Sequence, residues 1–171
     1  QDKGGEAARE LPTVNVQADA EKSAKDTYQA VTTRIGKGQQ ELRDIPQSVT
    51  VVTERLIGDR NLDTLKETLH STAGISFLAA EGGEEDIRLR GFSLQASGDI
   101  CVDGMRDPAF YERDTFNYDR LEVLRGSASM LFGRGSTGGA VNQVSKDPSL
   151  LNRHEAEVTV DDDLALRVFW T

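Results

Sequence analysis

The sequence predicts an α+β fold, in which a small mixed β-sheet is combined with short helices and long loops. Segments with alternating apolar residues, a pattern typical of half-buried strands, recur at 48–53, 120–124 and 140–146. The helical segments are short, such as the one at 54–59. Connecting segments are rich in glycine, which makes up 16 of the 171 residues and suits tight turns.

Residues 1–40 are predicted to form a disordered tail, because they offer few large apolar side chains whose burial would offset the entropy of ordering. One segment of the tail, residues 11–18 (LPTVNVQA), differs from the rest. Pro12 disfavours helix there, and the threonine and valines that follow favour extended backbone. Such a strip is suited to adding a strand to the edge of a partner's sheet. The alternative is a chance cluster of valines without a partner.

Folded structure is predicted to begin near Ile45. After the first strand and helix, Thr64-Leu-Lys-Glu67 has the form of a capping box and starts a second helix, which Gly74 ends. Strands at 75–78 and 86–89 flank an acidic, glycine-containing loop. This loop lacks the residue spacing of an EF-hand, so the sequence gives little support for a calcium site.

The loop at 105–116 (MRDPAFYERDTF) holds much of the aromatic content of the chain. Arginines beside aromatic rings can hold an aromatic, anionic ligand through stacking and cation–π contacts. Packing of the same side chains on a neighbouring protein surface is an equally supported alternative. The ligand-binding candidates are Arg106, Phe110, Tyr111, Arg113 and Phe116.

The stretch 117–146 carries the densest pattern. Its two strands are joined by a helix expected at 127–132, with Ser127 as the N-cap, and by the glycine-rich loop 133–139. The loop has the GxxxxG spacing of a phosphate-binding loop, but Gly139-Ala140 stand where Lys and Ser or Thr are required. It also follows a helix, the reverse of the order that points helix N–H groups at phosphate. A close-packed turn region is therefore favoured over a nucleotide site.

Composition excludes several classes of function. A net charge of −9 argues against a nucleic-acid partner, because no basic surface would attract phosphates. The single cysteine, Cys101, allows no internal disulfide and no cysteine-based zinc site, and its apolar neighbours predict a buried thiol rather than a reactive one. No apolar run approaches the roughly 20 residues of a membrane-spanning helix. Catalysis needs a positioned nucleophile, base or metal, and the sequence contains no such pattern.

The end of the chain has the pattern of a β-hairpin. Residues 154–160 and 164–170 alternate in polarity around Asp161-Asp-Asp163. Phe169-Trp170 is similar to the aromatic anchors of strands at a membrane interface.

Several motifs, in order, resemble the plug domain of TonB-dependent outer-membrane receptors. Within that family the chain is most similar to ferric-siderophore receptors, particularly those of the catecholate type. Together the motifs cover roughly residues 40–148. They are DIPQSVTVV at 44–52, IRLRGF at 87–92, Asp103-Gly104, LEVLRG at 121–126, FGRG at 132–135 and GGAVN at 138–142.

The resemblance implies a plug that closes the pore of a receptor in the bacterial outer membrane. It implies a ferric siderophore as the transported ligand, no covalently bound cofactor, no bound metal and no catalysed reaction. Residues 1–40 would be the periplasmic tail, 41–148 the plug, and 149–171 the first strands or a remnant of its β-barrel. The periplasmic protein TonB would grasp a TonB box in the tail, at Pro12, Thr13, Val14, Asn15 and Val16.

The resemblance also implies a role for two arginines that precede glycines. Arg90 and Arg125 match plug arginines that pair with glutamates of the barrel wall. Without a barrel, both side chains are expected to face water. The alternative to a plug is a soluble periplasmic binding or signalling domain that contacts a partner through residues 11–18.

Overall fold

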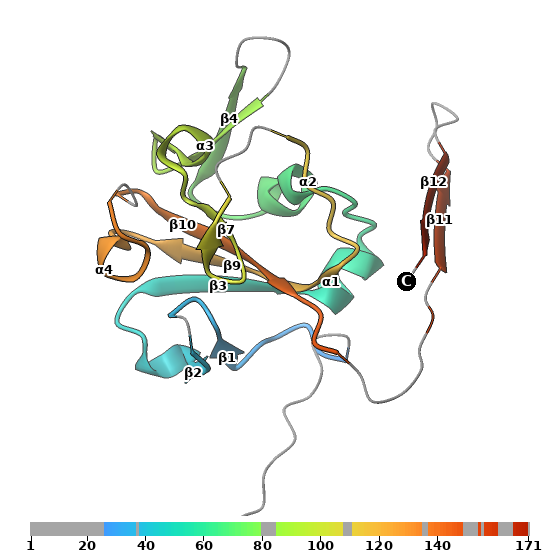
Figure 1. Ribbon diagram of the computed structural model, residues 1–171, viewed down its shortest axis with the longest axis horizontal. Coiled ribbons are helices and arrows are strands. Elements are labelled where there is room, and N and C mark those ends of the chain that lie inside the picture. Colours follow the sequence, from blue (N-terminus) through green and yellow to red (C-terminus); the bar gives the residue numbers. More distant parts are fainter. Residues whose placement is uncertain are drawn as a thin grey trace, which may run out of the picture.

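A computed structural model of the chain describes residues 26–36, 38–79, 85–107, 111–134, 137–148, 154, 156–160 and 166–170. Its centre is a five-stranded sheet with the order β3-β9-β10-β7-β8 (Figure 1). Strand β9 pairs antiparallel with β3 and β10, whereas β7 pairs parallel with β10. The predicted mixed sheet is therefore confirmed. The five strands are β3 (Ser48–Thr53), β7 (Ile100–Val102), β8 (Met105–Arg106), β9 (Tyr118–Arg125) and β10 (Gly139–Ser145).

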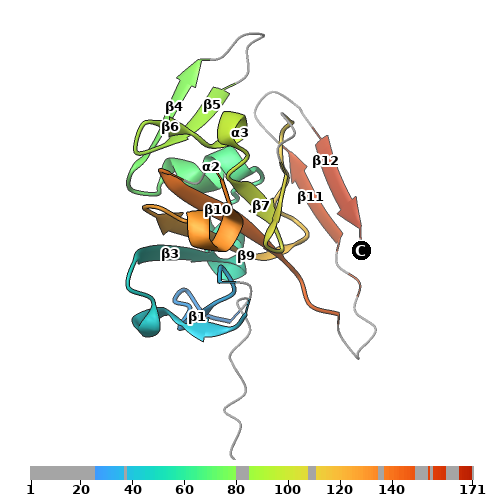
Figure 2. The same ribbon diagram turned by 60° about the vertical axis from the view of Figure 1, so that its left-hand side comes forward.

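Smaller elements surround this sheet. A three-stranded antiparallel sheet consists of β4 (Ile75–Ala79), β5 (Glu85–Leu89) and β6 (Phe92–Ser93). It lies with α3 at one end of the molecule, and β1 and β2 lie at the other end (Figure 2). The helices are α1 (Glu54–Asp59), α2 (Leu65–His70), α3 (Leu94–Ser97), α4 (Ser129–Phe132) and the 3₁₀ turn η1 (Leu42–Asp44). The remaining strands form two pairs, β1 (Thr32–Thr33) with β2 (Gln40–Glu41), and β11 (Ala156–Val160) with β12 (Leu166–Trp170).

Several predicted local structures are confirmed. Thr64 caps α2 through both bonds of a capping box: the Glu67 N–H donates to Thr64 Oγ1, and the Thr64 N–H donates to Glu67 Oε2. The C-terminal hairpin is present as β11 and β12. Cys101 is fully buried. None of the helices among the described residues has the length and apolar character needed to cross a membrane.

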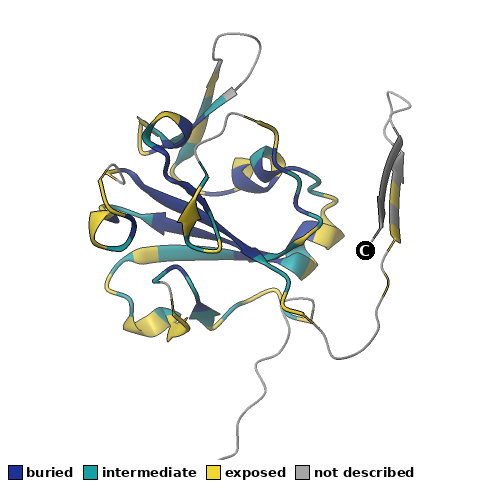
Figure 3. Cartoon of the chain, viewed as in Figure 1, coloured by how far each residue is buried: buried dark blue, intermediate teal, exposed yellow. Residues whose placement is uncertain are grey.

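Two apolar clusters lie on opposite faces of the sheet, because side chains alternate along each strand. Strands β9 and β10 are buried along most of their length (Figure 3). The first cluster joins the sheet to α1, α2, α3 and β5, and includes Ile57, Leu65, Leu69, Leu89, Leu94, Val123 and Val141. The second joins the other face to α4 and the N-terminal segment, and includes Ile35, Cys101, Leu124, Ala128, Phe132 and Ala140.

Ordered structure begins earlier than the sequence predicts. Thr33 and Ile35 are buried at 0% and 1% exposure, although both precede the expected start at Ile45 and lie within the predicted tail of 1–40. The physical reason is long-range packing, because Ile35 completes the second apolar cluster. This contact leaves no periodic pattern near Ile35 in the sequence.

The helix expected at 127–132 also begins later, at Ser129. Its N-cap is Ala128, and no side chain caps the helix. The Ser127 hydroxyl instead lies 3.2 Å from the Ser129 hydroxyl. Burial of Ala128 in the second cluster sets this start. Gly133 ends the helix with φ of 81° and ψ of −158°, so its φ is positive but its conformation is not left-handed helical.

Candidate functional site

Arg106, a predicted ligand contact, uses its guanidinium within the protein. Its Nε donates to the carbonyl of Phe132 at 2.9 Å, and its Nη1 donates to that of Ser97 at 3.1 Å. Its Nη2 donates to the carbonyl of Arg134 and lies 3.7 Å from the buried Asp99 carboxylate. Arg106 therefore ties β8 to the ends of α3 and α4, and so fixes where the loop after β8 begins.

Arg113, a second predicted contact, clamps the other end of this loop from within. Its side chain is only 2% exposed. The guanidinium donates to Asp107 Oδ2 at 3.1 Å, to the Asp107 carbonyl at 2.8 Å and to the Tyr111 carbonyl at 3.2 Å. It also lies 4.3 Å from the centre of the Tyr111 ring. These contacts hold Asp107 and Tyr111 in fixed positions, but they leave the guanidinium out of reach of a ligand.

Tyr111 is the candidate that faces solvent, with 48% of its surface exposed. Its hydroxyl donates to Asp107 Oδ2 at 2.6 Å. This hydrogen bond, followed by burial, raises the pKa of Tyr111, while the Arg113 charge opposes the change. Tyr111 is thus an uncharged, oriented phenol on a clamped loop.

Phe116 lies apart from this group. Lys146 Nζ is 4.9 Å from the centre of its ring and pairs with Glu54 at 3.2 Å. The ring lines a small pocket beside α1. Phe110 and the predicted TonB box at 12–16 lie outside the described residues. The structure therefore groups Tyr111 and Arg113, but it places Arg106 and Phe116 in other surroundings.

Contrary to the expectation, Arg125 does not face water. It is half-buried, and its guanidinium donates to the Ala73 carbonyl at 2.8 Å, to Thr50 Oγ1 at 2.7 Å and to Ser48 Oγ at 3.3 Å. Burial, followed by the nearby charge of Arg90, lowers the pKa of Arg125. The expectation is wrong because β9 places this side chain beside β3 and the turn before β4.

Arg90 meets the expectation of exposure. It has a positive φ of 52°, and its backbone N–H donates to the Gly74 carbonyl at 2.9 Å. Within the described part of the chain its guanidinium has no hydrogen bond or ion pair. Two like charges therefore lie near each other at the end of β9, and the one on Arg90 has no counter-ion among the described residues.

The Gly138-Gly139 pair closes the glycine-rich loop against β5 and β9. A Cβ on Gly138 would lie 2.5 Å from the Leu89 carbonyl oxygen, and one on Gly139 would lie 2.1 Å from the Leu124 carbonyl oxygen. Both distances are too short for any side chain. This supports the predicted close-packed turn rather than a phosphate site.

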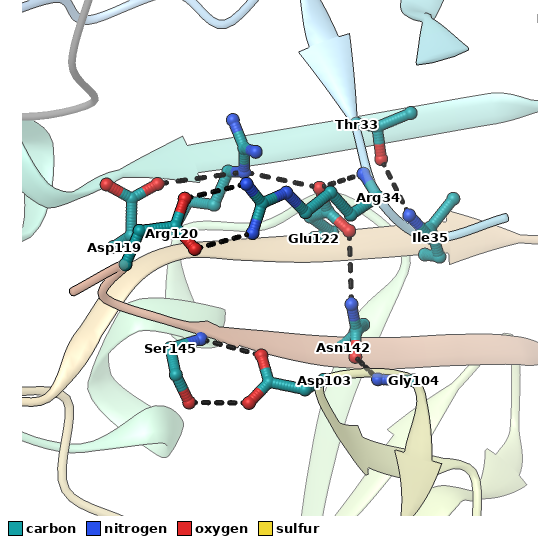
Figure 4. A network of polar contacts seen from close by, with 11 residues as sticks. Thr33, Arg34, Ile35, Asp103, Gly104, Asp119, Arg120, Glu122, Asn142 and Ser145 are labelled. Carbon is teal, nitrogen blue, oxygen red and sulfur yellow. Dashed lines mark hydrogen bonds and ion pairs between the residues drawn. The ribbon is translucent and has the colours of Figure 1, made fainter. Parts of the chain in front are cut away.

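Sequence reasoning missed the role of Asp107 as the partner of Tyr111 and Arg113. It also missed a buried polar network on β9 and β10. Glu122 is fully buried, and its carboxylate accepts from the Arg34 N–H at 2.8 Å and from Asn142 Nδ2 at 3.2 Å (Figure 4). The available signal was a glutamate inside the otherwise apolar strand LEVL. Among the residues that the structure describes, no group of three or more His, Cys, Asp or Glu side chains could hold a metal ion.

Residues 41–140 match the family described as TonB-dependent Receptor Plug Domain, and this range holds β3, β7, β8 and β9 and the start of β10. The chain belongs to this family, whose members are transport receptors rather than enzymes. The probable TonB-dependent receptor BfrD of Bordetella pertussis is 38% identical over 144 residues, which are 82% of this chain and 18% of BfrD. The ferric-pyoverdine M114 receptor PbuA of Pseudomonas sp. strain M114 is 37% identical over 151 residues, with the same coverage of 82% and 18%.

A solved structure agrees with this assignment. The closed form of the ferric-catecholate import receptor Fiu from Escherichia coli K12 superposes with a TM-score of 0.74 and 28% identity. The match covers 84% of this chain and 20% of Fiu. The chain thus spans about a fifth of the length of these receptors.

Proposed function

We propose that this chain is the gate of an outer-membrane receptor that takes up a ferric siderophore. The match of residues 41–140, which hold four strands of the five-stranded sheet and the start of the fifth, to the plug family carries the proposal. In this proposal residues 1–40 include the periplasmic tail, residues 149–171 begin the surrounding barrel, and TonB binds residues 12–16. The transported ligand is a ferric catecholate, for which the similarity to Fiu is the support. PbuA is named for a different ligand, so the ligand class needs its own test.

In the proposed site, Tyr111 contacts the siderophore, and Arg113 and Asp107 hold Tyr111 in place. The exposure of the Tyr111 ring and the burial of Arg113 support this division of roles. Phe110 lies in the same loop and remains a proposed contact. Arg106 supports the start of the loop.

Arg90 is proposed to pair with a glutamate of the barrel wall. Its exposed guanidinium has no acidic partner among the described residues, and a rigid guanidinium is suited to bind a carboxylate with two hydrogen bonds. Arg125 already makes three hydrogen bonds within the plug. It is therefore proposed to bind the barrel glutamate only through the guanidinium N–H groups that these bonds leave over.

Uptake is tested in an iron-starved bacterium that lacks its own siderophore receptors and carries the complete receptor containing this chain. Growth on ferric catecholate but not on ferric pyoverdine is expected. Growth on pyoverdine alone, or growth on neither compound, would contradict the proposed ligand.

Partner binding is tested by calorimetry with the periplasmic domain of TonB. The chain is expected to bind it, and Val14→Pro is expected to abolish binding, because proline removes a ladder donor and restricts the preceding residue. Ligand binding by the complete receptor should survive this change. A 171-residue chain that binds ferric siderophore tightly as a monomer in buffer would instead favour the soluble binding domain.

A further inference from the structure

A segment near the start of the described chain crosses the face of the sheet opposite to α2 without joining any of its strands. This segment, residues 31–41, is called the strap here; the structure describes it except for residue 37. Strands β1 and β2 of the strap pair only with each other among the described strands. The start of the strap is tied to the residue directly after its end, because the Leu42 N–H donates to the Val31 carbonyl at 2.9 Å. Its removal would therefore break no strand pair of the five-stranded sheet.

Side-chain contacts hold the strap to the sheet. Ile35 inserts into the second apolar cluster at 1% exposure. The Arg34 N–H donates to the buried Glu122 carboxylate at 2.8 Å (Figure 4). The Arg34 guanidinium forms a two-bond ion pair with Asp147, at 2.7 and 3.0 Å, just beyond the end of β10. Both ends of this pair are largely exposed, at 40% and 69%, so the pair adds little to the attachment.

Glu122 belongs to the sheet whether or not the strap is in place. Its second oxygen accepts from Asn142 Nδ2 at 3.2 Å, and Arg120 Nε lies 3.4 Å from its first oxygen. Asn142 in turn accepts from the Gly104 N–H at 2.8 Å. Because these partners remain when the strap leaves, and water can replace the Arg34 N–H, opening does not strand a buried charge.

An open cleft already lies beside the strap. It is lined by Arg34, Gly38 and Gln39 of the strap, by the turn at Asp103–Met105 and by the end of β10. The cleft therefore borders the strap on both sides of the buried Ile35.

We propose that the strap opens as a unit while the five-stranded sheet remains paired, and that opening exposes the apolar cluster around Cys101. Local opening of this kind is favoured where it breaks no strand pairing, and β1 and β2 of the strap pair with none of the strands of the five-stranded sheet. The strap is also the first described element after residues 1–25, apart from the short segment at 26–30. A partner that draws on residues 12–16, as in the proposed function, would first meet the contacts of Tyr28 with Arg55 and Asp59 of α1, and would then act on the strap before the sheet.

Cys101 provides a built-in reporter, because it is the only cysteine and is fully buried in the cluster that Ile35 completes. The experiment measures its rate of modification by a maleimide in the 171-residue chain under native conditions. Ile35→Ala is expected to raise this rate at least about thirtyfold, because removing a buried isoleucine side chain weakens the strap contact by that factor or more. The matched control, Leu69→Ala, removes a buried side chain on the opposite face and should leave the rate unchanged.

Two outcomes would overturn the proposal. An equal rise in both variants would mean that Cys101 reacts only after global unfolding. No rise with Ile35→Ala would mean that another element covers the thiol, and a large rise with Phe132→Ala alone would identify α4 as that cover.

A milder pair of variants covers the case in which Ile35→Ala does not fold. Arg34→Ala removes the ion pair to Asp147 and should raise the rate about two- to fivefold. Arg43→Ala removes an exposed pair with Glu41 that does not reach the sheet, and should not change it. In the unaltered chain, hydrogen exchange at the Arg34 and Ile35 amides should be at least tenfold faster than at Val123 and Val141 after correction for intrinsic rates. Equal protection would refute independent opening, whatever the outcome of the siderophore and TonB tests.

Discussion

Replacing Arg125 by alanine is expected to destabilise the 171-residue chain by about 2 kcal/mol. The change removes three hydrogen bonds, to Ala73, Thr50 and Ser48. A hydrogen bond contributes roughly 0.5–1.5 kcal/mol net, and the lower half of that range applies because two of the three are exposed. Relief of the repulsion from Arg90 offsets part of the loss.

The assay is urea unfolding followed by circular dichroism, supported by thermal unfolding. A lower midpoint with an unchanged slope is expected, together with a fall in Tm of about 4–8 °C. Arg90→Ala is the matched control: it removes a neighbouring guanidinium that has no hydrogen bond or ion pair within the described residues, so it should leave stability unchanged or slightly raise it. Equal losses in the two variants, or no loss with Arg125→Ala, would refute the reasoning. A larger loss from Arg125→Ala in the complete receptor than in the chain would reveal an added contact with the barrel.

Three further predictions concern the loop, the glycine pair and pH. Gly139→Ala should destabilise the chain by several kcal/mol or prevent folding, measured by urea unfolding, because its Cβ would meet backbone at 2.1 Å. Arg113→Gln should weaken siderophore binding by the complete receptor and raise the pKa of Tyr111, measured by NMR of ¹³C-labelled tyrosine, because the positive charge of Arg113 now lowers that pKa; unchanged values would contradict its positioning role. The hydrogen bond from Arg34 lowers the pKa of Asp147, so its stabilisation is present above the unfolded pKa of about 4 and is lost as pH falls through the lower folded value. Asp147→Asn should remove this part of the acid sensitivity in a pH series of urea midpoints.

Much of the local structure could be predicted from the sequence. The strand at 48–53, the helix at 54–59 and the capping box at Thr64 follow from alternation, helical spacing and side-chain bonds between residues a few positions apart. The C-terminal hairpin follows from the same kind of pattern. Several short motifs in the right order along the chain were also sufficient to recognise the plug family. Their glycines and apolar residues are required by tight turns and buried strands, so they can be read locally.

The partners of the charged side chains could not be predicted in this way. The candidate loop was recognised by its aromatic and arginine content, but the same composition fits a residue that touches a ligand and one that is buried beneath it. The fold decided that Arg113 is a buried clamp while Tyr111 is exposed.

Tertiary structure alone also decided the contacts of Arg125 and the burial of the strap. Arg125 meets Ala73 across 52 positions of sequence, and Arg34 meets Asp147 across 113. Ile35 is buried only because β7, β9 and α4 together form the cluster that receives it. A local pattern records which residues favour a strand or a helix. Burial and ion pairing depend on which distant segments the folded chain brings together, and that information is distributed over the whole sequence.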